Sequence, residues 1–105
     1  MLKENKEIIM TGDEVVELVK IIDHLLISIN NISHYYFNEK NTPESKILEV
    51  EQEIGHFFIK NNLGNSFIKA RGVLLGKFDN TLGDDDMDDI ERATESTQYW
   101  EKPGD

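Results

Sequence analysis

The chain has 105 residues and a formal net charge of −10, with 21 acidic residues against 11 lysines and arginines. Its length suits one domain, and 38% hydrophobic with 30% charged residues is typical of a globular chain. The absence of cysteine excludes disulfides, zinc–thiolate sites and thiol nucleophiles. Because no apolar run is long enough for a membrane span and the first residues are unlike a signal peptide, we expect a cytoplasmic protein.

The charge is concentrated toward one end of the chain. Residues 79–105 hold ten acids and two bases, a net charge of −8, whereas residues 1–78 sum to −2. An acidic surface favours a basic protein partner and disfavours nucleic acid, because phosphates need clustered Lys and Arg. The window 54–78 contains no acid, and we expect its four bases to pack near the acidic end of the same molecule: Lys60, Lys69, Arg71 and Lys77.

The strongest predicted element is a long amphipathic helix over residues 14–37. Apolar residues recur there at steps of three and four: Val15, Leu18, Val19, Ile22, Leu25, Leu26, Ile29, Ile32 and Tyr36. Thr11 followed three residues later by Glu14 predicts a capping box, with Asp13 as the alternative cap. The heptad-like spacing suits an antiparallel bundle as well as a coiled coil.

Residues 38–42 interrupt this pattern, and a second helix is expected to begin after them. Thr42 is a suitable N-cap, Pro43 suits the first helical position, and Glu44 favours the positive helix end. The apolar stripe of this helix consists of Ile47, Val50, Ile54, Phe57 and Phe58. We expect it to end near residues 61–64, with Gly64 in the left-handed capping conformation.

A third helix is expected after a cap at Asn65 or Ser66, and a fourth from about 84 to 100. The third carries Phe67, Ile68, Ala70, Val73, Leu74, Leu75 and Phe78, and the fourth carries Met87, Ile90, Ala93, Thr97 and Trp100. These patterns predict an all-α, four-helix antiparallel bundle-like domain with one long N-terminal helix. Residues 1–105 form a single domain in this prediction, with flexible ends at 1–10 and 102–105.

The sequence contains no complete motif for metal binding or for catalysis. The aspartates of residues 84–89 fit no EF-hand register, and Glu53 with His56 forms the single Glu-x-x-His pair. His24, His34 and His56 are expected at the surface, since they lie off the apolar stripes. We therefore predict no catalytic residue, no cofactor-binding residue, no metal ligand and no enzyme activity.

Protein recognition is the remaining interpretation. An acidic helix with aromatic residues beside it is suited to docking a basic partner. The predicted contact surface consists of Asp84, Asp85, Asp86, Asp88, Asp89, Glu91, Glu95 and Tyr99. Trp100 is expected mainly in the core, closing the bundle.

In size, charge and helix pattern the chain resembles bacterial toxin-immunity proteins, several families of which are small acidic helical bundles that cover a basic toxin domain. The resemblance implies that the chain neutralises a toxin or nuclease by steric and electrostatic block. Two alternatives remain open: a phage-type inhibitor that mimics nucleic acid, and a structural or assembly protein that homodimerises through the first helix. The second rests on Val15, Ile22, Ile29 and Tyr36 at strict intervals of seven.

Overall fold

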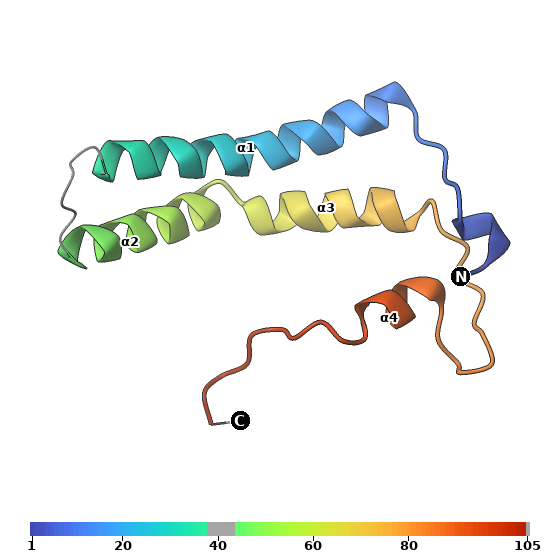
Figure 1. The fold of residues 1–105 in the computed structure, drawn as a ribbon. Helices are drawn as coiled ribbons and strands as arrows, with labels where there is room; N and C mark the ends of the chain where they lie inside the picture. The colour runs from blue at the N-terminus through green and yellow to red at the C-terminus, as the bar shows by residue number, and fades with distance from the viewer. Residues whose placement is uncertain (38–43, 105) are drawn as a thin grey trace. The chain divides into compact units, whose positions relative to one another are not determined.

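The computed structural model describes residues 1–37 and 44–104 (Figure 1). The described residues contain helices and no strand, which confirms the all-α class. A short 3-10 helix at Lys3–Asn5 precedes four α-helices: α1 Gly12–Tyr36, α2 Glu44–Lys60, α3 Leu63–Leu75 and α4 Asp89–Thr94. Thr42 and Pro43, predicted to begin the second helix, lie outside the described residues.

The chain divides into two compact units. The helical unit is continuous and runs from Met10 to Val73, whereas the terminal unit joins Met1–Ile9 to Leu74–Asp105. The helical unit contains α1, α2 and most of α3, and the terminal unit contains the 3-10 helix and α4. Each unit has its own set of interactions.

The start of α1 is fixed by the predicted capping box at Thr11. The Glu14 amide donates to Thr11 Oγ1 at 3.1 Å, and the Thr11 amide donates to Glu14 Oε1 at 2.9 Å. Two of the amides that a helix start leaves without partners are thereby satisfied. The capping box is confirmed, and Asp13 lies inside the helix rather than at its cap.

Helices α1 and α2 contact each other in reversed order along the chain. His24 meets Phe57 edge to face, with ring centroids 5.4 Å apart, and the Lys46 ammonium lies 5.8 Å from the centroid of the Tyr36 ring. Loss of solvent on this side raises the pKa of the Tyr36 hydroxyl, and the Glu53 and Glu49 carboxylates raise it further. Later residues of α1 therefore meet earlier residues of α2.

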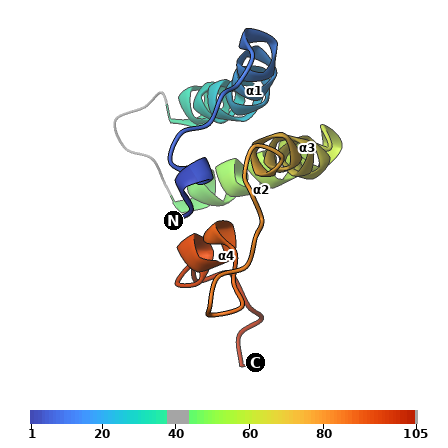
Figure 2. The ribbon, with the colours of Figure 1, turned by 90° about the vertical axis from the view of Figure 1, so that its right-hand side faces the viewer.

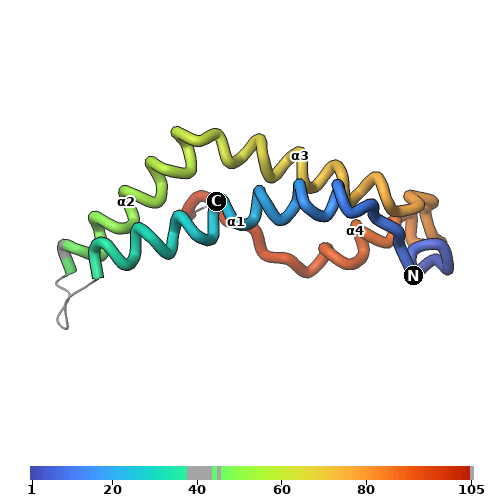
Figure 3. The backbone as a smooth tube through the Cα atoms, turned by 90° about the horizontal axis from the view of Figure 1, so that it is seen from above, coloured from blue at the N-terminus to red at the C-terminus, as the bar shows by residue number. Residues whose placement is uncertain are grey.

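Helices α2 and α3 follow each other on the same side of α1 (Figures 1 and 3). The junction between them is the left-handed residue Asn62, with φ of 55°, and not Gly64 as predicted. Asn tolerates this conformation better than most residues because its short polar side chain bonds locally. The predicted caps Asn65 and Ser66 are also wrong, since α3 already begins at Leu63.

Few apolar side chains of the described residues are buried. Val50 on α2 and Leu63 at the start of α3 are 6% and 0% exposed, and they form the buried apolar core. No residue of α1 reaches that level of burial. The contact between α1 and α2 therefore leaves much apolar surface open on both helices.

The terminal unit brings the first residues of the chain against α4 (Figure 2). Helix α4 is much shorter than predicted, with six residues instead of a helix over 84–100. The preceding segment is a loop, in which the Gly83 amide donates to the Met87 carbonyl at 2.9 Å and Asp86 has φ of 60°. Aspartate side chains bond nearby backbone groups here, and such bonds compete with helix formation.

None of the helices in the described part of the chain is long and apolar enough to cross a membrane.

Candidate protein-binding surface

Arg92, the single base of α4, is held in place by two aspartates of its own unit. Its Nε and Nη2 atoms donate to Asp85 at 2.9 and 2.7 Å, and Nη1 donates to Asp89 at 3.0 Å. Nη2 also donates to the Met87 carbonyl at 3.1 Å. The planar guanidinium thus ties the acidic loop to the helix through a forked geometry that lysine cannot reproduce.

Asp89 is the buried member of this cluster, with 6% of its surface exposed. Its Oδ2 atom accepts from the Leu2 amide at 2.8 Å and from Asn5 Nδ2 at 2.7 Å, while Oδ1 accepts from Arg92. Both carboxylate oxygens are therefore occupied within the terminal unit. A carboxylate satisfied in this way is structural and has little left to offer a partner.

These hydrogen bonds change the acidity of the cluster. The Arg92 guanidinium and then the Met87 amide lower the pKa of Asp85 to about 2, from a usual value near 3.8. Hydrogen bonds from Asn5 and then from the Leu2 amide lower the pKa of Asp89 despite its burial. The Asp85 contact in turn raises the pKa of Arg92. The cluster is therefore fully ionised at neutral pH.

Two further aspartates have local structural roles. Asp88 is the N-cap of α4, where its Oδ1 atom accepts from the Glu91 amide at 2.8 Å. Asp79 Oδ1 accepts from the amide and the hydroxyl of Thr81 at 2.9 and 2.6 Å, and these bonds lower its pKa. Much of the acidic run thus organises the loop that precedes α4.

Of the seven acids predicted to form the contact surface, four are exposed and have none of the structural contacts described above: Asp84, Asp86, Glu91 and Glu95. None of the ion pairs formed by the described residues uses one of these four carboxylates. We call them the open acidic set. Arg92, the single base of α4, pairs with Asp85 and Asp89 and with none of these four carboxylates.

Exposed aromatic residues follow the open acidic set along the chain. Tyr99 is 71% exposed, beside an open hollow of about 400 Å³ lined by Thr97, Gln98, Tyr99 and Glu101. Trp100 is 82% exposed, so the expectation that it closes a bundle core is wrong. The reason is the early end of α4 at Thr94, after which no helix carries the indole toward a core.

The eight residues predicted from sequence fall into two groups in the structure. Asp85, Asp88 and Asp89 hold the terminal unit together, whereas Asp84, Asp86, Glu91, Glu95 and Tyr99 present their side chains to solvent. Sequence reasoning missed the role of Asn5, which is 4% exposed and bonds Asp89. An asparagine so far away along the chain carries no local signal that would have revealed this contact.

The described residues contain no group of three or more His, Asp or Glu side chains placed to hold a metal ion. His24, His34 and His56 all lie exposed, as predicted. The basic window 54–78 and the acidic end belong largely to different units, so the expectation that they pack together stays a prediction.

In class, the chain is all-helical, with an acidic and aromatic segment open to solvent. No protein-family model matches it, and no solved structure matches it. The 3-dehydroquinate synthase of Clostridium tetani is 41% identical to it over 73 residues. The alignment covers 68% of this chain and 19% of that enzyme, so the chain spans about a fifth of the length of this relative.

Proposed function

We propose that this chain is a small protein-binding module that neutralises a basic partner, in the manner of a toxin-immunity or inhibitor protein. Its contact surface is the open acidic set, Asp84, Asp86, Glu91 and Glu95, together with the exposed side chain of Tyr99. The open acidic set attracts the basic partner, Tyr99 anchors it, and the bound module blocks the partner's active surface by its bulk. Under this proposal the chain itself performs no catalysis.

The engagement of Arg92 by Asp85 and Asp89 is the observation that supports this proposal most directly. It commits the single base of α4 to two structural carboxylates, while four nearby carboxylates stay without an ion pair among the described residues. Uncompensated charge of one sign raises the rate of encounter with a partner of the opposite sign, at the cost of self-repulsion. An excess of acidic charge would bring no benefit to a segment whose single role is to fold.

The proposal also retains two parts of the sequence-based interpretation. The first is a bundle-type scaffold with antiparallel helices, for which the reversed contacts of α1 and α2 give partial support. The second is a cytoplasmic setting, for which the absence of cysteine is the support.

The direct experiment is co-expression with the product of the adjacent upstream gene. We expect that product to be toxic alone, to be tolerated together with this chain, and to co-purify with it at nanomolar strength. The complex should weaken as salt is raised, because exposed charges are screened. An adjacent product that is harmless, or that does not bind, would contradict the immunity role.

A matched pair of variants tests the proposed contact surface. The quadruple change Asp84→Asn, Asp86→Asn, Glu91→Gln and Glu95→Gln should abolish co-purification and rescue while leaving thermal unfolding nearly unchanged. The control removes four acids from α1, with Asp13→Asn, Glu17→Gln, Asp23→Asn and Glu14→Gln. It alters net charge equally and should retain binding. Equal loss in both variants would show that net charge, and not this surface, matters.

The similarity to part of 3-dehydroquinate synthase favours a second candidate function. Under this alternative the chain is a helical piece that works together with an enzyme of that kind. Purified chain, alone and mixed with such an enzyme, would then change the rate at which 3-dehydroquinate is formed. No change in either assay would count against this candidate and leave the immunity role standing.

A further inference from the structure

We propose that the helical unit docks on a second copy of this chain through one open apolar face, shared by α1 and the α2–α3 pair. This inference rests on the helical unit alone and is independent of the acidic surface and its partner. The open apolar face consists of seven residues: Val15, Val19, Ile22, Leu26, Ile47, Phe58 and Phe67.

The α1 part of the face is a heptad seam of four residues, each about half exposed. Val15, Val19, Ile22 and Leu26 follow steps of four, three and four, and they are 45%, 46%, 52% and 62% exposed. At about 100° per residue, they occupy a strip of roughly 60°. That strip lies beside the better-covered residues that turn toward α2: Leu18, Ile21, Leu25 and Ile32.

The two strips together give α1 an unusually wide apolar arc, of roughly 160°. One neighbouring helix covers a narrower stripe than this, whereas a helix in a bundle core contacts two neighbours. No charged residue interrupts the arc between Val15 and Tyr36. The pattern therefore indicates a second neighbour for α1, and that neighbour must be apolar.

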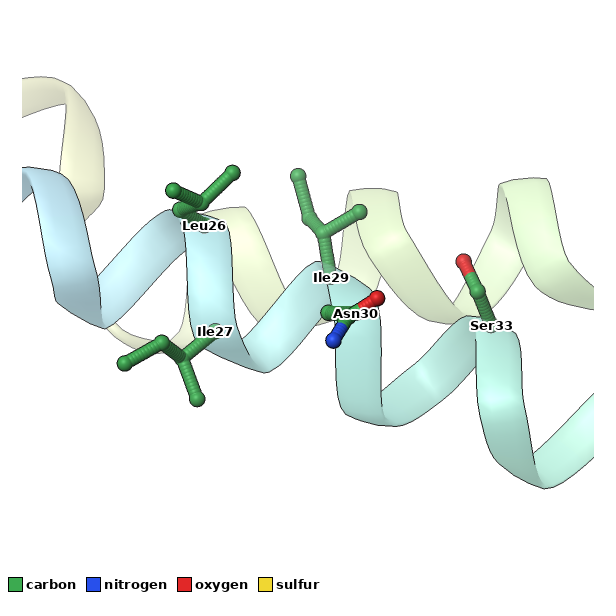
Figure 4. A pocket seen from close by; sticks show the side chains of 5 residues that line it. All are labelled: Leu26, Ile27, Ile29, Asn30 and Ser33. Carbon is green, nitrogen blue, oxygen red and sulfur yellow. The ribbon is translucent and has the colours of Figure 1, made fainter.

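The later part of the seam, at Leu26, lies beside four other residues of α1 that line a groove. Leu26, Ile29 and Ser33 point to one side of the helix, and Ile27 points to the other (Figure 4). Leu26, Ile27, Ile29, Asn30 and Ser33 line a shallow groove of about 430 Å³. All five belong to α1, and the groove shares Leu26 with the seam.

The exposed apolar residues of α2 and α3 border the same side. Helices α2 and α3 run opposite to α1. When all three are viewed from one end, successive residues of α2 and α3 therefore turn in the opposite sense to those of α1. Ile47, Phe58 and Phe67, which are 45%, 37% and 36% exposed, then fall on the margin next to the α1 seam. By this helical-wheel argument these exposed apolar residues of the three helices face in the same direction.

The size of this face matches what a dimer needs. At these exposed fractions the seven residues present on the order of 550 Å² of apolar surface. Each partner of a standard interface contributes about 800 Å², of which about 65% is apolar in homodimers. One face of this size per copy therefore supplies the apolar share of a stable symmetric interface.

The charges at the margin of the face point to a second copy as the occupant. Glu51 on α2 and Arg71 on α3 are both exposed, and they lie at equal distances in sequence from Asn61 at the junction. A two-fold axis that passes near the junction sets Glu51 of one copy opposite Arg71 of the other. A two-fold interface must be complementary to itself, and this pairing of opposite charges would satisfy that condition.

Sedimentation of the full chain from about 1 to 100 µM tests the inference, since interfaces of this size have micromolar or tighter dissociation constants. We expect a species of twice 12.1 kDa that persists in high salt. The double variant Ile22→Asp, Leu26→Asp should sediment as a monomer, with at least a hundredfold weaker self-association. Ile59→Asp, Ile68→Asp is the matched control, on exposed apolar residues outside the face, and should remain a dimer.

Two results would overturn the inference. One is a wild-type chain that stays monomeric over the whole concentration range, which would mean that another occupant covers the face. The other is a seam variant that dimerises as well as the control does. If the seam variant fails to fold, the concentration dependence of the wild type decides, because the thermal midpoint of a dimer rises with concentration and that of a monomer does not.

Discussion

Asn5 and Asp89 are 84 residues apart in the sequence and are joined by a 2.7 Å hydrogen bond from Nδ2 to Oδ2. The same asparagine donates to the Asp79 carbonyl at 3.0 Å, and its Oδ1 atom accepts from the Asp79 amide at 2.7 Å. One buried side chain therefore connects the first turn of the chain both to the acidic loop and to α4. The terminal unit depends on this contact for its closure.

Replacing Asn5 with alanine should destabilise the terminal unit by about 1–3 kcal/mol, because buried backbone and carboxylate groups lose their partners. Asn5→Asp should be worse at neutral pH, since it places a second carboxylate beside Asp89. Urea unfolding and amide exchange at Leu2 and Asp79 measure both effects. Asn80→Ala, at an exposed position of the same unit, is the control and should be nearly neutral. Equal effects of the two alanine changes would refute the assigned role of Asn5.

The lowered pKa of Asp85, about 2 when folded, predicts how stability depends on pH. The unfolded carboxyl titrates near its usual value, so its contribution is complete above about pH 5 and is lost as pH falls toward 2. The lowered pKa values of Asp89 and Asp79 act in the same direction. Urea midpoints should therefore be flat from pH 5 to 7 and should fall below pH 4.

The variant Asp85→Asn isolates this contribution. It should be less stable than the wild type at neutral pH and should lose less stability on acidification. The difference between the two proteins should shrink between about pH 4 and pH 2. Asp84→Asn, at an exposed neighbouring position, should follow the wild-type profile. A constant difference between Asp85→Asn and the wild type across this range would show that Arg92 does not hold the carboxylate.

The backbone at the α2–α3 junction predicts opposite outcomes for two nearby substitutions. Asn62 has φ of 55°, so Asn62→Val should cost about 1–2 kcal/mol, whereas Asn62→Gly should be tolerated. Gly64 lies inside α3, and an added Cβ would meet Phe58 at an ordinary 3.9 Å. Gly64→Ala should therefore stabilise by about 0.5–1 kcal/mol, and thermal unfolding measures all three. A stabilising Asn62→Val or a strongly destabilising Gly64→Ala would be inconsistent with the junction.

The proposed dimer predicts a reciprocal effect of two charges. Glu51→Arg should weaken self-association several-fold because it faces Arg71 of the other copy, and Arg71→Glu should do the same. The double variant restores the pairing and should recover most of the loss. Sedimentation at low and high salt measures the coupling, which should diminish as salt rises. Additive losses in the double variant would place the two-fold axis elsewhere.

Local patterns in the sequence were sufficient to predict the features that depend on neighbouring residues. The capping box of Thr11 and Glu14, the helical class and the exposed histidines all follow from spacing along one helix. The fourth helix was predicted too long because aspartates bond to the backbone of a loop as readily as they cap a helix. The exposed Trp100 follows from that same error.

The hydrogen bonds from Leu2 and Asn5 to Asp89 could not be predicted, because these two residues are distant from Asp89 in the sequence. The contribution of Leu2 is a backbone amide, which leaves no trace in residue type. The contribution of Asn5 depends on a contact that forms only when the terminal unit closes. For the same reason the acidic run could be recognised as a surface, whereas its division into structural and open carboxylates needed the three-dimensional arrangement.

The terminal unit is assembled from both ends of the described chain, with the whole helical unit inserted between its two parts. This arrangement has a consequence for the order of events during synthesis. The helices can form from contacts that are local, whereas Asn5 must wait until Asp79 and Asp89 have left the ribosome. A nascent chain therefore carries an incomplete acidic loop until residue 89 has been made. The surface proposed to engage a partner is therefore completed only after the helices that precede it have been made.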